Sequence, residues 1–306
     1  MKFAGQGTNF PKAPHILPSV PYGALSSNSF LPKILHLLLP TMHSLRLFLL
    51  VCFLSLVSSH EAGSDHVFTR PLIVQYATNS DLSGAAGEEL SLHCTSWRFA
   101  VETNNLSPWK TIPEECAGYV RDYMMGKGYV LDLERVSKEA EVYAESVEMS
   151  ADGMNAWIFD IDETLLSNLP YYADHSFGLE AFDHPKFDMW VERGMAPAIQ
   201  PSLRLYEEVV RLGFKIFFLT GRTEKHRKVT VENLMIAGFH NWDKLILRSA
   251  EDYGKLATAY KSEKRDEIVR EGYRIMGNSG DQWSDLLGSS VSARSFKLPN
   301  PMYYIL

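Results

Sequence analysis

The stretch AWIFDIDET, residues 156–164, decides the fold of this chain. An apolar run that stops abruptly on carboxylates predicts a buried parallel strand whose acidic end emerges at the carboxyl edge of an α/β sheet. Open α/β sheets bind their ligands at that edge. Alternation should turn Asp160 and Asp162 to the same side, where two like charges favour a bound cation. The alternative is a strand followed by a solvated acidic turn, with Thr164 as a helix N-cap.

Apolar runs and helical patterns alternate along the chain after this stretch. The expected strands are residues 156–159, 215–219, 245–247 and 273–276, and the expected helices are residues 201–212, 223–237 and 253–271. Strands that alternate with helices in this way predict a doubly wound, mainly parallel sheet of Rossmann type. We therefore expect an α/β core over residues 151–306.

Two segments fall outside this alternation. Residues 167–198 are rich in aromatic side chains, prolines and glycines and have no strong period. Their place after the first strand predicts a small cap over the carboxyl edge of the sheet. Residues 61–150 should form a helical N-terminal segment, with helical spacing at 114–125 and 132–150.

The composition is that of a globular protein with a sizeable core. The chain has 306 residues, of which 45% are apolar, and a formal net charge of −7. This charge and the lack of a Lys/Arg-rich run with interleaved aromatics argue against a nucleic-acid binder. Small molecules are the expected partners, and a homodimer stays open.

The front of the chain has the features of a secretory leader. A basic start at residues 42–46 precedes an apolar run at 47–57 and two small residues, so residues 42–60 are expected to form a signal peptide. The run is shorter than the about 20 residues of a membrane span, which makes a signal anchor the lesser alternative. Met42 would then be the biological start, with residues 1–41 a disordered or spurious upstream extension. A genuine 41-residue leader is the other interpretation.

Signal cleavage would leave two cysteines, Cys94 and Cys116. In a secreted chain this pair favours one disulfide worth about 3 kcal/mol, with two buried free thiols as the alternative. Asn105, in the sequence Asn-Leu-Ser, is a candidate glycosylation site, although Pro108 directly after it argues against its use.

Polar side chains follow three of the expected strands, and the βα topology should bring them to one edge of the sheet. Several carboxylates there suit a hard cation such as Mg²⁺. A hydroxyl and a lysine beside that metal suit a phosphate group. The residues that follow the expected strands are Asp160, Asp162, Thr220, Gly221, Asp281 and Asp285. Lys261 and Lys264 belong to the expected helix over residues 253–271 and could reach the same edge.

In these motifs the sequence resembles the haloacid dehalogenase (HAD) superfamily of phosphohydrolases. The matching stretches are DIDET at 160–164, FLTGR at 218–222, YKSEKR at 260–265 and GDQWSD at 280–285. Together with the ending KLPNPMYY at 297–304, they are similar to the plant secreted acid phosphatases and vegetative storage proteins, a class B-like group. The resemblance covers roughly residues 94–306 and leaves out residues 1–41.

The resemblance implies a Mg²⁺-dependent acid phosphatase, secreted or vacuolar, that hydrolyses small phosphomonoesters. Asp160 would be the nucleophile and Asp162 the general acid and base, whose backbone carbonyl also joins the metal ligands. Asp281 and Asp285 would complete the metal site. A storage protein of the same fold with weak or no catalysis is the alternative, but the intact Asp160 favours an enzyme.

Thr220, Gly221 and one lysine would bind the phosphoryl group. Lys261 is favoured over Lys264 because Ser262 could act as an N-cap and place Lys261 at the mouth of a helix.

Overall fold

The computed structural model describes residues 82–306, so the expected leader and signal peptide lie outside the described residues. The described part contains a five-stranded parallel sheet with the strand order β3-β2-β1-β4-β5. The strands are β1 (Asn155–Phe159), β2 (Lys215–Thr223), β3 (Lys244–Arg248), β4 (Arg274–Gly280) and β5 (Arg294–Lys297). The doubly wound fold is confirmed. The four expected strands are present, and β5 is an additional edge strand.

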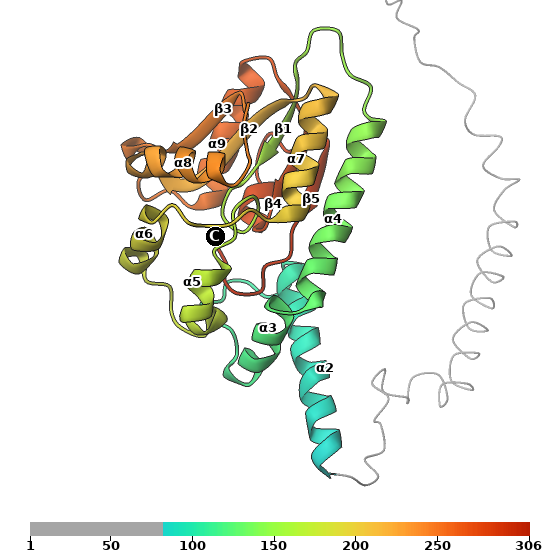
Figure 1. Ribbon diagram of the computed structural model, residues 1–306, viewed down its shortest axis with the longest axis vertical. Coiled ribbons are helices and arrows are strands. Elements are labelled where there is room, and N and C mark those ends of the chain that lie inside the picture. The colour runs from blue at the N-terminus through green and yellow to red at the C-terminus, as the bar shows by residue number, and fades with distance from the viewer. Residues whose placement is uncertain (1–81) are drawn as a thin grey trace, which may run out of the picture. The chain divides into compact units, whose positions relative to one another are not determined.

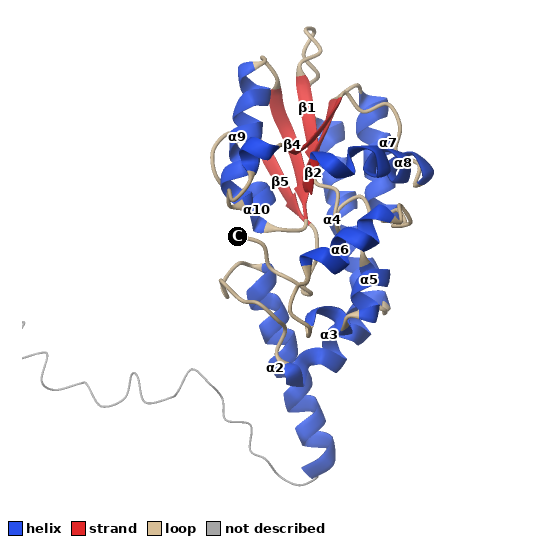
Figure 2. Cartoon of the chain, turned by 90° about the vertical axis from the view of Figure 1, so that its left-hand side faces the viewer, coloured by secondary structure: helices blue, strands red, loops and turns tan. Residues whose placement is uncertain are grey.

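Helices cover both faces of the sheet. Helices α4 (Lys127–Ser146), α7 (Gln200–Leu212) and α8 (Arg227–Ile236) lie on one side, and α9 (Ala257–Arg270) and α10 (Trp283–Leu286) lie on the other (Figure 2). Alternation along β1 supplies both interfaces. Trp157 and Phe159 pack into the larger core with α7, whereas Ala156 and Ile158 pack with Tyr260 of α9. Burial on both faces explains why β1 is apolar throughout.

The centre of the sheet is tightly packed around Trp157. Its ring stacks on Phe296 of β5 at a centroid distance of 5.5 Å, and its Nε1 donates to Ser279 Oγ at 3.1 Å. A Cβ at Gly277 would lie 2.4 Å from the Trp157 ring, so only glycine fits at that point of β4. This packing fixes β1 beside β4, and their carboxyl ends carry Asp160 and Asp281 to neighbouring positions.

The N-terminal part of the described chain is helical. Helix α2 (Leu82–Glu102) is followed by the 3-10 turn η1 (Glu114–Cys116), by α3 (Ala117–Met124) and by α4. A disulfide joins Cys94 to Cys116, as the sequence predicts, with the two Cα atoms 5.4 Å apart. The first half of α2 projects away from the rest of the described chain (Figures 1 and 2). Among the described residues, no helix has both the length and the apolarity needed to cross a bilayer.

The cap consists of α5 (Leu169–Asp174), the 3-10 turn η2 (Ser176–Gly178) and α6 (His184–Glu192). It lies at the carboxyl ends of the strands, where the sequence places it (Figure 1). The expected helix over residues 253–271 is partly wrong. A separate 3-10 turn, η4 (Ala250–Asp252), precedes it, and α9 begins only at Ala257. A 3-10 turn, η3 (Glu224–His226), likewise precedes α8.

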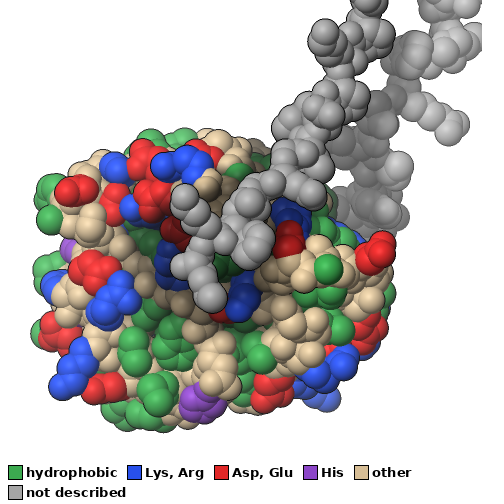
Figure 3. Space-filling view, turned by 90° about the horizontal axis from the view of Figure 1, so that it is seen from above, with side chains coloured by type: hydrophobic (Ala, Val, Ile, Leu, Met, Phe, Trp, Pro, Cys, Tyr) green, Lys and Arg blue, Asp and Glu red, His purple; other side chains and the backbone are tan. Residues whose placement is uncertain are grey.

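Acidic and basic side chains are interspersed on the face shown in Figure 3, outside the area that grey atoms cover. Ion pairs lie near the amino ends of the strands, among them Lys215 with Asp243 and Lys244 with Glu271. These pairs lie far from the motif residues, which gather at the opposite, carboxyl ends.

Candidate active site

A cavity of about 700 Å³ lies between the carboxyl ends of the strands and the cap. Its polar floor is formed by motif residues, and its walls are largely aromatic. The floor includes Asp160, Asp162, Gly221, Lys261, Asp281 and Asp285, and the walls include Trp109, Tyr172, Phe182, Phe187, Tyr303 and Tyr304. The topology therefore brings motifs that are up to about 120 residues apart in the chain into one enclosure.

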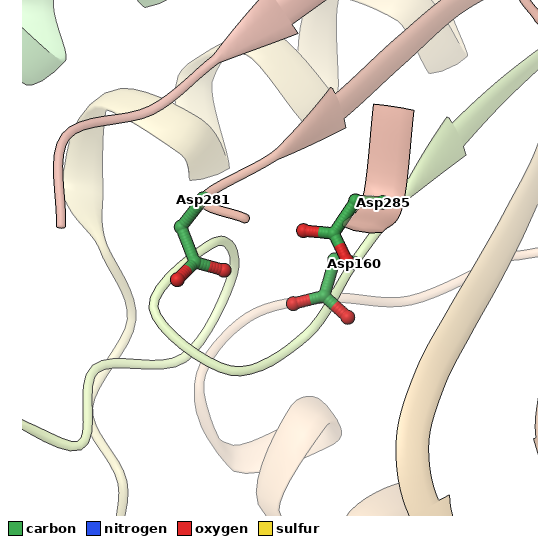
Figure 4. A group of neighbouring side chains, drawn as sticks. All are labelled: Asp160, Asp281 and Asp285. Atoms are coloured by element: carbon green, nitrogen blue, oxygen red, sulfur yellow. The ribbon is translucent and has the colours of Figure 1, made fainter. Parts of the chain in front are cut away.

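Three buried carboxyl groups gather at the floor: Asp160, Asp281 and Asp285 (Figure 4). Asp160 directly follows β1, and its backbone N–H donates to the Ser279 carbonyl of β4 at 2.9 Å. Asp281 directly follows β4, and Asp285 belongs to α10. One oxygen of each lies within 4.8 Å of the others. A buried set of oxygen donors this close together fits a hard divalent cation.

Lys261 lies directly beside this carboxyl cluster. Its Nζ donates to Asp160 Oδ1 at 2.5 Å and also to Asp285 Oδ1. Burial opposes its charge, but the two carboxylates outweigh burial and raise the pKa of Lys261. Lys264, the second candidate, points elsewhere and bonds Glu267 at 3.0 Å. Of the two candidate lysines, the structure therefore places Lys261 and not Lys264 at the cavity.

The expected N-cap role of Ser262 is nevertheless wrong. Ser262 is no N-cap, because it lies inside α9, where its Oγ accepts the backbone N–H of Ser289 at 3.1 Å. Lys261 faces the site because it sits one helical turn after the start of α9 at Ala257, on the buried side of the helix.

Asp162 has turned away from the carboxyl cluster and is held by Arg222. The Arg222 Nε lies 3.0 Å from Asp162 Oδ2, and its NH2 lies 2.7 Å from Oδ1. Burial opposes ionisation, but the charge and hydrogen bonds of Arg222 prevail and lower the pKa of Asp162. The expectation of four clustered carboxylates is thus corrected to three. The chain turns directly after Asp160, so strand alternation does not continue to Asp162.

Burial shifts the pKa values of two of the clustered carboxyl groups, Asp160 and Asp281. It raises the pKa of Asp160 well above its usual range, although the Lys261 charge opposes this shift. Burial and the charge of Asp285 raise the pKa of Asp281 to about 6. Asp281 Oδ2 is held by Asn300 Nδ2 at 2.7 Å and by Gln282 Nε2 at 2.9 Å. A nearby cation would favour the charged form of all three carboxyl groups.

The end of β2 and the loop after β1 are fixed by buried polar contacts at the floor. Thr220 is fully buried, and its Oγ1 accepts the Arg222 backbone N–H at 3.1 Å, while Gly221 lines the cavity. Glu163 has a φ of 56° and accepts bonds from the Asn168 backbone N–H at 2.5 Å and from the Tyr129 hydroxyl at 3.2 Å. Burial raises the pKa of Glu163 to about 8.

The C-terminal segment ties the site to the N-terminal helix. Glu102 of α2 accepts bonds from Lys297 Nζ at 2.7 Å and from the Asn300 backbone N–H at 2.8 Å. Asn300 in turn holds Asp281. Sequence reasoning named neither Arg222 nor Asn300 as a site residue. Both stand inside quoted motifs, FLTGR and KLPNP, which are the signal that could have identified them.

A family model described as "HAD superfamily, subfamily IIIB (Acid phosphatase)" matches residues 79–306. The chain belongs to this family. The expected resemblance is therefore confirmed for the part of the chain that contains the site.

Individual relatives of this phosphatase agree with the family match. Acid phosphatase 1 of Solanum lycopersicum is 62% identical over 262 residues, which are 86% of this chain and all of that protein. Stem 31 kDa glycoprotein of Glycine max is 46% identical over 72% of this chain and 86% of its own length. Vegetative storage protein 1 of Arabidopsis thaliana is 42% identical over 70% of this chain and 79% of its own length.

The fold also matches a solved structure, the class C acid phosphatase from Bacillus anthracis. The TM-score is 0.50 at 20% identity, and the match covers 60% of this chain and 83% of that one. This likeness concerns the fold alone.

Proposed function

We propose that this acid phosphatase hydrolyses small phosphomonoesters in a Mg²⁺-dependent reaction that passes through an aspartyl-phosphate on Asp160. The observation that carries the proposal is the position of Asp160. Its carboxylate lies at the floor of the cavity, against the Lys261 ammonium group and beside two further carboxyl groups. A buried carboxylate beside fixed positive charge is suited to attack the phosphorus of an anionic ester.

The proposed reaction has two steps. In the first, an Asp160 carboxylate oxygen bonds to phosphorus as the bond to the ester oxygen breaks, and Asp162 gives a proton to the leaving alcohol. In the second, Asp162 takes a proton from water, whose oxygen attacks phosphorus, and Asp160 is released with inorganic phosphate. The Arg222 pair lowers the pKa of Asp162, which favours the ionised form that the second step requires and opposes the protonated form that the first step requires.

Charge and hydrogen bonds at the floor would hold the phosphoryl group. Lys261 and the Gly221 backbone are proposed as phosphate ligands because they line the cavity floor with Asp160. The hydroxyl of Thr220, the buried residue directly before Gly221, is proposed as a third ligand. Asp160, Asp281, Asp285 and the backbone carbonyl of Asp162 would hold Mg²⁺. The bound ion supplies positive charge that offsets the charges of the carboxylates and the phosphate.

Two isosteric variants test the proposal. Asp160→Asn should remove nearly all turnover of 4-nitrophenyl phosphate while the circular dichroism spectrum and the melting temperature stay close to wild type. Asp162→Asn should still be phosphorylated by this activated ester but should lose the base for hydrolysis, so phosphoenzyme should accumulate. Rapid quenching and mass spectrometry of the peptide that contains Asp160 would detect it. Mg²⁺-dependent turnover that survives Asp160→Asn would contradict the nucleophile assignment.

A storage role is the second candidate, because the relatives include proteins named vegetative storage proteins. In such a protein the fold would persist without need for an intact site. The presence of Asp160, Asp162 and Lys261 together favours the enzyme. Purified protein that shows no turnover of any phosphomonoester, with or without added Mg²⁺, would favour storage instead.

Passage through the secretory route is proposed from the predicted signal peptide and the disulfide, and two relatives have names that describe stem glycoproteins. Asn105 is exposed, as glycosylation requires. Enzymatic deglycosylation of plant-expressed protein should then reduce its mass, and Asn105→Gln should abolish that change.

A further inference from the structure

A chain of hydrogen bonds leads from the cap to the proposed acid and base. Trp190 Nε1, on α6, donates to Asn168 Oδ1 at 2.8 Å, and Asn168 Nδ2 donates to Asp162 Oδ1 at 2.8 Å. Asn168 is fully buried and Trp190 half-buried. We propose that Asn168 and Trp190 are positioning residues that fix the Asp162 carboxyl group for proton transfer. This inference rests on the role proposed above for Asp162.

The chemistry of the three side chains decides which group donates and which accepts in each of these hydrogen bonds. An indole N–H can only donate, so Trp190 requires an acceptor and turns the carbonyl oxygen of the Asn168 amide toward itself. The amide NH₂ group must then face Asp162, which as a carboxylate only accepts. Without the Trp190 N–H, the amide could rotate and present its oxygen to the carboxylate, which is repulsive. Trp190 therefore acts on Asp162 through Asn168.

The backbone of Asn168 is also fixed by hydrogen bonds, so its position relative to Asp162 and Trp190 can change little. Its N–H donates to Glu163 Oε1 at 2.5 Å, and its carbonyl accepts the Tyr172 N–H at 3.0 Å. Only the side-chain amide is free to respond to Trp190. Removal of a group that orients a functional side chain by a hydrogen bond typically changes activity by about 10- to 100-fold.

Core and cap thus share control of one carboxyl group. Arg222, at the end of β2, binds Asp162 from the core, whereas Asn168, which is itself held by Trp190, binds it from the cap side. A displacement of α6 would break the bond between Trp190 and Asn168 without disturbing the Arg222 pair. Asp162 is therefore held by both Arg222 and the Asn168–Trp190 pair only when the cap is in the position seen here.

A purely structural role makes a different prediction from a positioning role. If Asn168 and Trp190 only satisfy buried polar groups, their loss should lower stability and reduce kcat/KM equally for all substrates. If they position Asp162, the loss in kcat/KM should grow as the leaving group becomes more basic, because such groups need the proton. The parameter kcat/KM is suitable because it reports the steps up to phosphoryl transfer and excludes later hydrolysis of the phosphoenzyme.

The experiment compares Asn168→Leu and Trp190→Phe with wild type on 4-nitrophenyl, phenyl and alkyl phosphates at saturating Mg²⁺. We expect kcat/KM to fall only a few-fold with 4-nitrophenyl phosphate and on the order of 10- to 100-fold with the alkyl ester. Trp242→Phe is the matched control, because Trp242 is another half-buried tryptophan that packs on Phe218, away from the cavity. The Trp242→Phe variant should show no dependence on the leaving group.

Melting temperatures establish that each variant is folded. If Asn168→Leu does not fold, the test rests on Trp190→Phe.

The Asp162→Asn background separates this inference from the proposed function. On that background, Asn168→Leu and Trp190→Phe should add no further dependence on the leaving group, since the proton donor is already gone. A uniform loss for all esters in both variants would overturn the positioning role and leave the function of Asp162 intact. If Asp162→Asn itself shows no dependence on the leaving group, the acid role of Asp162 fails and this inference fails with it.

Discussion

Glu163 lies fully buried between the Tyr129 hydroxyl and the Asn168 backbone N–H, and burial raises its pKa from an ordinary 4.5 to about 8. The folded protein therefore binds a proton at Glu163 over a pH range in which the unfolded chain has released it. Where the native state binds more protons than the unfolded state, the free energy of unfolding falls as pH rises. Mildly acid conditions should therefore stabilise the metal-free fold.

We predict that the metal-free protein loses stability between about pH 4.5 and pH 8, with an upper limit of roughly 5 kcal/mol from Glu163. Glu163→Gln mimics the protonated form at every pH and should flatten this decline. Urea unfolding at pH 5 and pH 8 in the presence of a chelator measures the effect. A wild-type protein that is more stable at pH 8 than at pH 5 under these conditions would contradict the assignment.

The two candidate lysines give a second prediction at this scale. Lys261→Met removes the cation beside Asp160, so kcat/KM should fall on the order of 100-fold or more. Lys264→Met breaks only contacts with Glu267 and Asp252 outside the cavity, and kcat/KM should stay within about two-fold of wild type. Steady-state kinetics on one substrate checks both. Equal losses in the two variants would mean that the pairing with Asp160 has no role in catalysis.

Sequence reasoning found the residues whose position follows from the backbone and missed those whose position follows from packing. Asp160 and Asp281 directly follow parallel strands, so topology alone predicts that they meet. Arg222 and Asn168 reach the site through the orientation of their side chains. The side chain of Asp162 lies outside the carboxyl cluster because the chain turns directly after Asp160, and Arg222 binds the Asp162 carboxylate in that position.

At the scale of elements, burial decides what could be predicted. Strands β1 to β3 each contain a run of at least three apolar residues, and β4 contains Ile275 and Met276, which gives a signal in the sequence. The edge strand β5 buries only Phe296 between charged or polar neighbours, so its pattern is weak. Helix α2 has no clear helical spacing of apolar residues, because most of its described side chains are exposed. The start of α9 was misplaced because a capping box between Ser249 and Asp252 forms a separate turn before it.

The disulfide between Cys94 and Cys116 holds α2 against η1. Cross-linking residues 22 apart restricts the unfolded chain, and its loss should cost about 3 kcal/mol. We predict that Cys94→Ala/Cys116→Ala has a lower urea midpoint than wild type, and that its free energy of unfolding is lower by about 3 kcal/mol. Alkylation of denatured wild-type protein without reductant should add no mass at either cysteine. Alkylation at both would show that the thiols are free.

At the scale of the whole molecule, the predicted signal peptide leads to a prediction about the mature chain. Small residues close the apolar run, so secreted protein should begin near residues 59–63. N-terminal sequencing of protein secreted by plant cells checks this. A sequence that begins before Met42 would show that residues 1–41 are translated and retained.

The link from Glu102 to Asn300 also constrains the biosynthesis of this enzyme. Asn300 is synthesised 198 residues after Glu102, yet it is Asn300 that reaches both α2 and the Asp281 carboxylate. A nascent chain that has not yet extruded Asn300 from the ribosome can form β1 to β4 but leaves Asp281 without this partner. The hydrolytic centre is therefore not complete until Asn300 has left the ribosome, and shorter growing chains are expected to be inert toward phosphate esters.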